Sequence, residues 1–197
     1  MPVDIEGRGW ELRVTRLGLQ HRHGERVRTY GAYQLFIDGQ PIVNLAGHTC
    51  ECTGPGDNTV DGTREHLRIE EGRYSLSTQF GSHFHSVGFT ANASHPMPGF
   101  LVLGTAARSG ILVHPGHPPE LYLSSIGCIN LTKPLTASQD MDFTDSRGRV
   151  VALLASLKQH DPHAFAIGRI GHDTVIVDAF LVVDGEPMTP VREDVVA

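Results

Sequence analysis

The sequence predicts a mainly β fold with one or two helices, in one domain that spans residues 1–197. Short apolar segments alternate with turns, because 22 glycines and 12 prolines interrupt the chain. Hydrophobic residues make up 40% of the 197 residues, which is enough for a globular core. No internal repeat or long linker divides the chain. We therefore expect a core over about residues 10–185 and a frayed polar tail over residues 187–197.

The first part of the chain predicts a strand and then a hairpin. Residues 10–17 alternate apolar and polar side chains, as a half-buried strand does. Residues 32–37 and 40–45 are the arms of a hairpin, joined by an Asp-Gly turn at 38–39. The stretch 53–63 is rich in glycine, proline and aspartate, so we expect a loop there.

Further strands follow in the middle of the chain. Residues 68–78 predict a turn followed by a strand, and residues 91–98 predict a loop. Residues 100–103 and 109–113 are short apolar strands. The second of these ends at His114, which we expect at a strand edge and not deep inside the protein.

The clearest helix is predicted over residues 146–160, with Asp145 or Ser146 as its N-cap. A nine-residue strand at 175–183 then ends at an Asp-Gly turn. The helix prediction depends on apolar residues at near-helical spacing, which are Val150, Val151, Leu153, Leu154 and Leu157.

Charge and hydropathy exclude several classes of function. The net charge is −6, whereas binding to nucleic acid as a main partner needs a basic face. No apolar run approaches the ~18 residues expected of a membrane span. Residues 1–7 have neither the basic start nor the apolar centre of a secretory signal. We therefore expect synthesis in the cytoplasm with non-classical export, or a chain whose leader has been removed.

Cys128 is the candidate nucleophile. It lies in the string SIGCIN at 125–130, fourteen residues after His114. The thiolate is the attacking form of cysteine, and an imidazole can take the proton of the thiol or hold it as an ion pair. The alternative reading makes Cys128 a small buried hydrophobic residue and His114 the cap of a turn.

The neighbours of Cys128 suit the same chemistry. Gly127 lets a substrate approach the backbone closely, and the N–H groups of Gly127 and Cys128 are candidate donors to an oxyanion. Ser125 can donate a hydrogen bond to that oxygen or to the substrate. Asn130 can orient a peptide amide or brace the loop.

These two segments resemble the active-site signature of the L,D-transpeptidases. In that family a histidine at a strand end, typically in a His-Gly pair, precedes a block of the form Ser/Thr-x-Gly-Cys-x-Asn/Arg. The strings ILVHPG at 111–116 and SIGCINL at 125–131 match most of it. Pro115 separates the histidine from the glycine, and Ile126 stands where many members have histidine. Only ten residues separate His114 from Ser125, so a lid over the groove would be small.

The strong match covers residues 108–131. The string EEGRY at 70–74 is more loosely similar to small cysteine-containing domains that share the His…Gly-Cys arrangement. The chain also resembles, more distantly, L,D-transpeptidase-like toxins that some bacteria inject into rivals. An immunity protein or a delivery protein would be the partner of such a toxin.

The resemblance implies a β-sandwich or barrel with a groove that leads to Cys128. It implies a peptidoglycan stem peptide as substrate, no cofactor, and action in the periplasm or cell envelope. Cys128 would attack the bond between an L-centre and D-alanine and form a thioester, which an amine or water would resolve. His114 would activate the thiol, with its other ring nitrogen held by a carbonyl of the following loop. Arg108 and Gly116 would lie on the substrate side, with Arg108 meeting a carboxylate or remaining solvated.

Two other groups of residues suggest weaker alternatives. Cys50 and Cys52 flank one glutamate, and we expect two reduced thiols because a bridge across one residue is awkward. Histidine pairs at 21/23 and 83/85 suggest a zinc site or a zinc hydrolase, but the spacing lacks a third and fourth ligand, so we expect no metal. Residues 82–86 are more simply solvent-facing or part of a groove. A non-catalytic module on the same scaffold, which binds a cell-wall peptide or a protein, is the second functional hypothesis.

Overall fold

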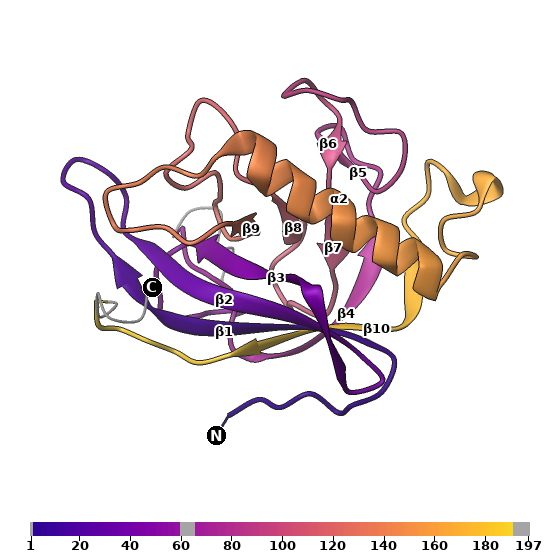
Figure 1. The fold of residues 1–197 in the computed structure, drawn as a ribbon, viewed down its shortest axis with the longest axis horizontal. Helices are drawn as coiled ribbons and strands as arrows, with labels where there is room; N and C mark the ends of the chain where they lie inside the picture. The colour runs from indigo at the N-terminus through magenta and orange to yellow at the C-terminus, as the bar shows by residue number, and fades with distance from the viewer. Residues whose placement is uncertain (1, 60–65, 191–197) are drawn as a thin grey trace.

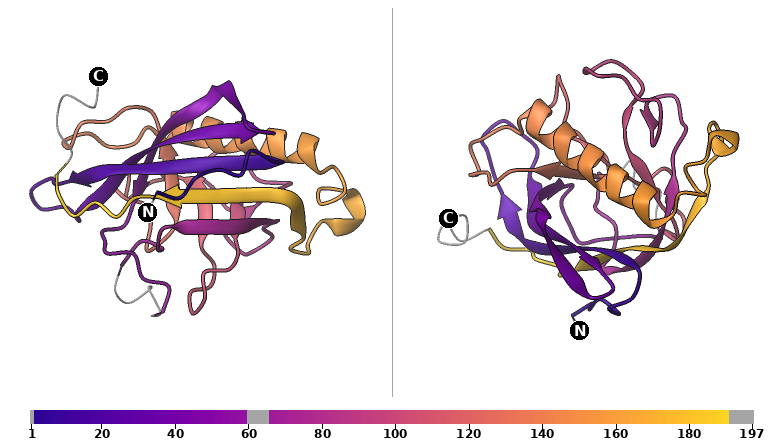
Figure 2. Two further views of the ribbon diagram at one scale, coloured as in Figure 1. Left: turned by 90° about the horizontal axis from the view of Figure 1, so that it is seen from below. Right: turned by 45° about the vertical axis from the view of Figure 1, so that its right-hand side comes forward.

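A computed structural model describes residues 2–59 and 66–190. Eight of its strands form a closed barrel in the order β1-β10-β4-β7-β8-β9-β3-β2, and a short sheet pairs β5 with β6 (Figures 1 and 2). The mainly β prediction is therefore confirmed, with a barrel as the architecture. The strands are β1 (Trp10–Gln20), β2 (Arg28–Ile37), β3 (Gln40–Glu51), β4 (Gly72–Thr78), β5 (Phe84–His85), β6 (Met97–Pro98), β7 (Phe100–Val102), β8 (Leu112–Pro115), β9 (Ile129–Thr132) and β10 (Val175–Asp184).

The predicted hairpin forms between β2 and β3. Asp38 and Gly39 have φ angles of 48° and 77°, and such positive values at both central residues are those of a type I′ turn. The strands on either side extend beyond the predicted arms, because β2 also pairs with β1 and β3 also pairs with β9. The predicted loop at 53–63 lies partly outside the described residues.

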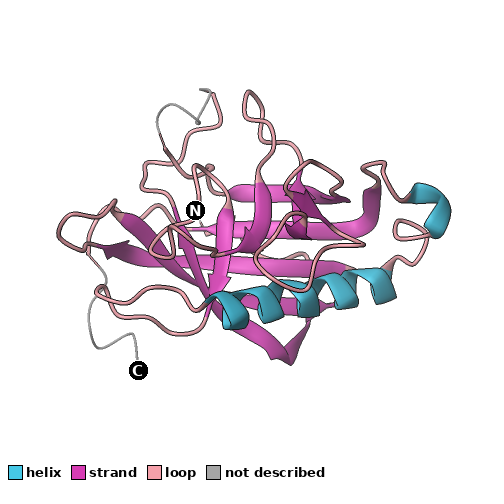
Figure 3. Ribbon diagram, turned by 90° about the horizontal axis from the view of Figure 1, so that it is seen from above, coloured by secondary structure: helices cyan, strands magenta, loops and turns pink. Residues whose placement is uncertain are grey.

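The long helix α2 (Phe143–His160) begins three residues before the predicted start. Its N-cap is Asp142, which accepts a hydrogen bond from the Asp145 N–H at 2.9 Å, so the prediction of Asp145 or Ser146 as cap is wrong. The helix packs against β8, β9 and β3, and a 3-10 turn, η1 (Ile167–Arg169), follows it (Figures 1 and 3).

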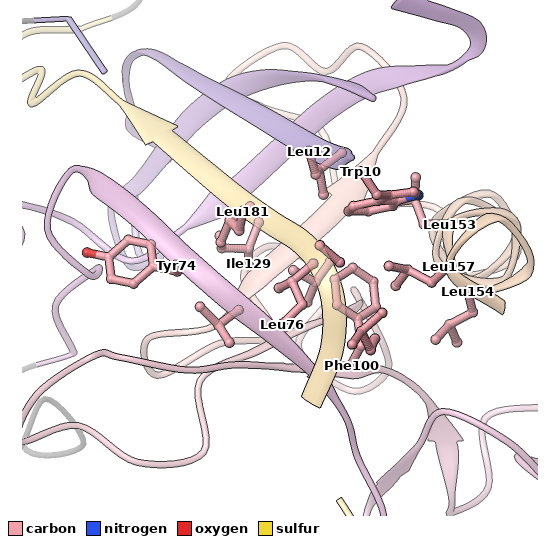
Figure 4. Packing of buried hydrophobic residues seen from close by; sticks show 14 of the residues in the cluster. Trp10, Leu12, Tyr74, Leu76, Phe100, Ile129, Leu153, Leu154, Leu157 and Leu181 are labelled. Atoms are coloured by element: carbon pink, nitrogen blue, oxygen red, sulfur yellow. The ribbon is translucent and has the colours of Figure 1, made fainter. Parts of the chain in front are cut away.

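The main core lies inside the barrel and under α2. The rings of Trp10 and Phe100 meet edge to face with their centroids 6.4 Å apart, and Leu153 and Leu157 of α2 pack beside them (Figure 4). The indole N–H of Trp10 donates to Ser156 Oγ at 3.0 Å. The apolar stripe of the helix therefore packs α2 against the barrel, next to β8 and β9.

A second buried cluster lies on the outside of the barrel, beside β2 and β3. It contains Tyr30, Cys50, Cys52, Tyr122, Leu123, Leu135 and Met141. Residues 121–123 belong to the loop between β8 and β9, so this cluster fastens that loop against the barrel. All three cysteines are free, which confirms the expectation of reduced thiols at Cys50 and Cys52.

Buried ion pairs connect segments of the barrel close to the end of β10. Arg16 of β1 bonds Glu51 of β3 at 2.8 Å, and both side chains are fully buried. Glu186, just after β10, bonds both Arg16 and Arg68 at 2.8 Å. These charges satisfy one another, which is the condition for burying them.

The segment 187–190 does not fray as predicted. The Leu19 N–H donates to the Thr189 carbonyl at 2.8 Å, and Pro190 forms a bridge with Leu19. Residues 191–197 lie outside the described part. In the described residues, no helix combines the length and the apolar character that a membrane crossing requires.

Candidate active site

Strands β8 and β9 bring the predicted cysteine and histidine to one face of the barrel. The two strands are parallel neighbours, with Val113 opposite Ile129 and His114 opposite Asn130. Val113 and Ile129 belong to the interior core, so alternation places His114 and Asn130 on the outer face. Cys128 directly precedes Ile129 and therefore shares that face. Strand spacing and rise place the Cα atoms of His114 and Cys128 roughly 8 Å apart on the diagonal.

The short contact with the Pro115 carbonyl assigns one tautomer to the His114 ring. Its Nδ1 lies 2.8 Å from the Pro115 carbonyl, and because a carbonyl oxygen only accepts, Nδ1 carries the proton and Nε2 keeps its lone pair. A backbone carbonyl holds this nitrogen, but it belongs to Pro115, the last residue of β8, and not to the following loop as expected. The side chain is buried rather than at the edge, with 3% exposure, so that prediction is wrong. Burial lowers the pKa of His114 to about 3, and the imidazole is neutral.

Two aromatic residues that the active-site motif does not include cover His114. The Phe84 ring lies 4.3 Å from the His114 ring, centroid to centroid, and the His117 ring lies 5.9 Å away. The segment 82–86 therefore lies against the candidate base through Phe84. The histidines at 83 and 85 mark this segment in the sequence, but Phe84 between them makes the contact with His114.

Cys128 is a neutral thiol with little exposure. Its Sγ accepts from the Leu112 N–H at 3.4 Å and donates to the Gly110 carbonyl at 3.6 Å. Burial raises the pKa of the Cys128 thiol to about 11, and 9% of the residue is exposed. Within the described residues, no hydrogen bond joins this sulfur to the His114 ring. In the resting state Cys128 is therefore a thiol and His114 a neutral imidazole, and the two do not form an ion pair.

The turn before Cys128 is held by the Ser125 hydroxyl. Ser125 Oγ accepts from the Gly127 N–H at 2.9 Å and donates to the Cys128 carbonyl at 2.7 Å. The thiol of Cys52 donates to the Ser125 carbonyl at 3.3 Å. Because the Gly127 N–H and the Ser125 hydroxyl are engaged within the turn, the expectation that they face an oxyanion does not hold in this conformation.

Arg108 is buried beside this turn. It is 5% exposed, and its guanidinium donates to the Leu67 carbonyl at 2.7 Å and to the Asp57 carbonyl at 3.4 Å. The same group lies against Gly127, so close that a Cβ at that position would meet it. The expectations of a carboxylate-binding or a solvated arginine are both wrong, because the side chain is buried against backbone carbonyls.

The side chain of Asn130 holds the loop before Cys128 against the end of β8. Its Oδ1 accepts from the Ser124 N–H at 3.1 Å. Its Nδ2 donates to the carbonyls of His114 at 3.4 Å and Pro115 at 3.5 Å. The side chain is fully buried, so of the two roles expected for it, bracing the loop is the one that this geometry provides.

Gly116 is also a packing position. Its N–H donates to Ser146 Oγ at 2.8 Å, and that hydroxyl in turn donates to the Leu131 carbonyl. A Cβ on Gly116 would lie 2.5 Å from the methyl group of Met141. Gly116 therefore joins β8 and β9 to the start of α2 and is buried, which contradicts the expectation that it contacts substrate.

The exposed part of the site is small and partly apolar. Ile126 is 47% exposed beside Gly127, although large aliphatic side chains are usually buried. Together with the accessible part of Cys128 and the half-buried His117, it is what a ligand would meet on approach. Comparisons of this chain with protein-family models, with curated proteins and with solved structures gave no match.

Proposed function

We propose that this protein is a cysteine acyltransferase or peptidase that acts on peptidoglycan stem peptides, with an L,D-transpeptidase-like fold. The observation that carries the proposal is the placement of Cys128 and His114 on one outer face of adjacent strands, with the Nε2 lone pair of His114 unprotonated. That arrangement provides a nucleophile and a base on the same side of the sheet.

The proposed acylation starts from two neutral groups. The pKa values of about 11 for Cys128 and about 3 for His114 oppose a resting ion pair, so proton transfer has to accompany carbon–sulfur bond formation. The sulfur turns from the Gly110 carbonyl toward His114 and passes its proton to Nε2 as it attacks the carbonyl carbon. The carbon–nitrogen bond then breaks, and the leaving D-alanine amine takes the proton from His114. A thioester on Cys128 remains.

Three features of the described residues support this sequence of steps. The Pro115 carbonyl stabilises the imidazolium that forms briefly on His114, as an orienting acceptor does in other nucleophile–base pairs. The Cys128 N–H is our candidate donor to the oxyanion. The exposed side chain of Ile126 offers an apolar contact to the substrate beside the reacting sulfur.

D-alanine release tests the proposal. Purified protein is incubated with a disaccharide tetrapeptide, and released D-alanine and the peptide product are quantified. We expect release by the wild type, loss of at least about a hundredfold in Cys128→Ser and His114→Gln, and unchanged release in Cys50→Ser. The Cys50 thiol is buried in the outer cluster, so it serves as the matched control. Equal rates in Cys128→Ser and wild type would refute the proposal.

A second candidate function is a non-catalytic module that binds a cell-wall peptide or a protein. The specific observation in its favour is the hydrogen bonding of the Cys128 sulfur to Gly110 and Leu112, with a pKa of about 11. This function predicts that Cys128→Ser keeps full binding to isolated cell-wall sacculi and that no D-alanine is released by any variant.

A further inference from the structure

Two His-Pro dipeptides occur in a row, at 114–115 and 117–118, and they place their imidazoles in the same way. The Nδ1 of His114 lies 2.8 Å from the Pro115 carbonyl, and the Nδ1 of His117 lies 3.0 Å from the Pro118 carbonyl. Because carbonyl oxygens only accept, each contact assigns a proton to Nδ1 of its ring. Each ring therefore keeps a basic lone pair on Nε2.

The two rings are close neighbours within one aromatic group. Their centroids lie 5.9 Å apart, and the Phe84 ring lies 4.3 Å from His114 and 6.1 Å from His117. His114 is buried, whereas His117 is half-buried. A reactant that arrives from solvent would meet His117 before His114.

The backbone of His117 is held firmly enough to position its ring. The His117 N–H donates to Ser124 Oγ at 2.8 Å, and the same hydroxyl lies 2.9 Å from the His117 carbonyl. The Ser124 N–H in turn donates to Asn130 Oδ1 at 3.1 Å, and Asn130 lies opposite His114. His117 is thus connected to the floor of the candidate site through two side chains.

We propose that His117 is the second base of the site and acts on the acceptor, an inference that rests on the proposed function. After acylation, a water molecule or a neutral amine binds beside His117. Its proton passes to His117 Nε2 as its oxygen or nitrogen forms a bond to the acyl carbon, and the carbon–sulfur bond breaks. Cys128 leaves as a thiolate and takes up one proton from solvent, while His117 releases one, so protons and electrons balance.

The division of work follows from the position of the two rings. His114 has given its proton to the leaving amine at the end of acylation, and it lies under Phe84 with little exposure. His117 is accessible to the second reactant, and its Nε2 is assigned as the acceptor in the same way as that of His114. General base catalysis of this kind contributes typically 10²–10⁴-fold.

The test separates the two half-reactions in His117→Gln, which removes the base and keeps a side chain of similar reach. Intact-protein mass spectrometry follows the acyl-enzyme on the disaccharide tetrapeptide, and product analysis follows turnover. We expect the first D-alanine to be released at the wild-type rate, the thioester to accumulate, and turnover to fall about a hundredfold. In His117→Ala, added imidazole should restore part of the turnover. The control is His163→Gln, at an exposed position beyond α2.

Three outcomes overturn the inference, and the third also overturns the proposed function. Wild-type turnover in His117→Gln, with acylation intact, contradicts the role of His117 and leaves the proposed function standing. Equal loss of acylation and turnover in His117→Gln, with no rescue of His117→Ala by imidazole, shows a structural role and also overturns the inference. No acylation of the wild type overturns the proposed function, and the inference with it.

Discussion

The guanidinium of Arg108 fills the space beside Gly127 into which any other residue would project its Cβ. Its Nη2 lies 2.0 Å from the position of that atom, and Gly127 has a φ of 147°, which residues with a side chain rarely adopt. A glycine is thus required at position 127 for two reasons. Its φ angle disfavours a side chain, and Arg108 occupies the space that a Cβ would need. Arg108 therefore shapes the turn that carries Cys128.

Gly127→Ala should destabilise the protein by more than the ~1–3 kcal/mol that an unfavourable φ costs alone. Gly104→Ala is the matched control, because Gly104 has a φ of 81° and open space around it. Urea denaturation gives the free energies of unfolding. The double variant Arg108→Ala/Gly127→Ala should cost less than the sum of its single variants, because truncating Arg108 removes the clash with the new Cβ. Strict additivity would show that the two residues do not contact.

A small thiol-selective electrophile should label Cys128 before Cys50 and Cys52. Burial raises the pKa of each of the three thiols to about 11, so thiolate content does not separate them. Cys50 and Cys52 are fully buried, whereas Cys128 retains some exposure. Peptide mapping after brief exposure to iodoacetamide measures the order. Labelling of all three at one rate would mean that global unfolding, and not access to the site, controls the reaction.

The pH dependence of that labelling follows from the raised pKa of Cys128. Below its pKa the thiolate fraction rises tenfold per pH unit, so the rate should still be rising at pH 10 and should level near pH 11. A free thiol levels near pH 8.5–9. Stopped-time alkylation from pH 7 to 11 measures the profile. A plateau below pH 8 would show that the thiol is ionised by a nearby charge.

Acid should destabilise the protein through His114. The folded-state pKa of about 3 lies below the ordinary value of 6.5, so the unfolded chain binds a proton more readily. The stabilising contribution is complete above about pH 6.5 and is lost as the pH falls toward 3. Between pH 7 and 5 this single group costs roughly 2 kcal/mol. His114→Gln should lose correspondingly less over that range in urea denaturation, whereas His163→Gln should follow the wild type.

Local sequence patterns predicted the turns and helices that interactions between neighbouring residues determine. The Asp-Gly pair at 38–39 has the φ angles that the turn needs, and the apolar stripe of α2 meets the core as expected. The start of α2 was missed because Phe143 and Thr144 carry no helical periodicity, while the capping side chain of Asp142 decides where the helix begins. Alternation along β8 and β9 gives the shared face of His114 and Cys128, but only once the parallel register is known.

Roles that depend on distant segments could not be predicted from the sequence. Arg108 is buried because it meets the carbonyl of Leu67, which lies forty-one residues away along the chain. Phe84 covers His114 because the short β5–β6 sheet folds back over β8.

The turn at 125–128 is local, yet the sequence does not show which of its N–H groups form hydrogen bonds within the turn.

The central claim is that the Cys128 sulfur becomes acylated with the help of the imidazole across the strand pair. Intact-protein mass spectrometry after incubation with a carbapenem or the tetrapeptide, followed by peptide mapping, tests it most directly. The account predicts one adduct, on Cys128, formed much more slowly in His114→Gln. An unmodified wild-type protein, or an adduct that persists in Cys128→Ser, would contradict it.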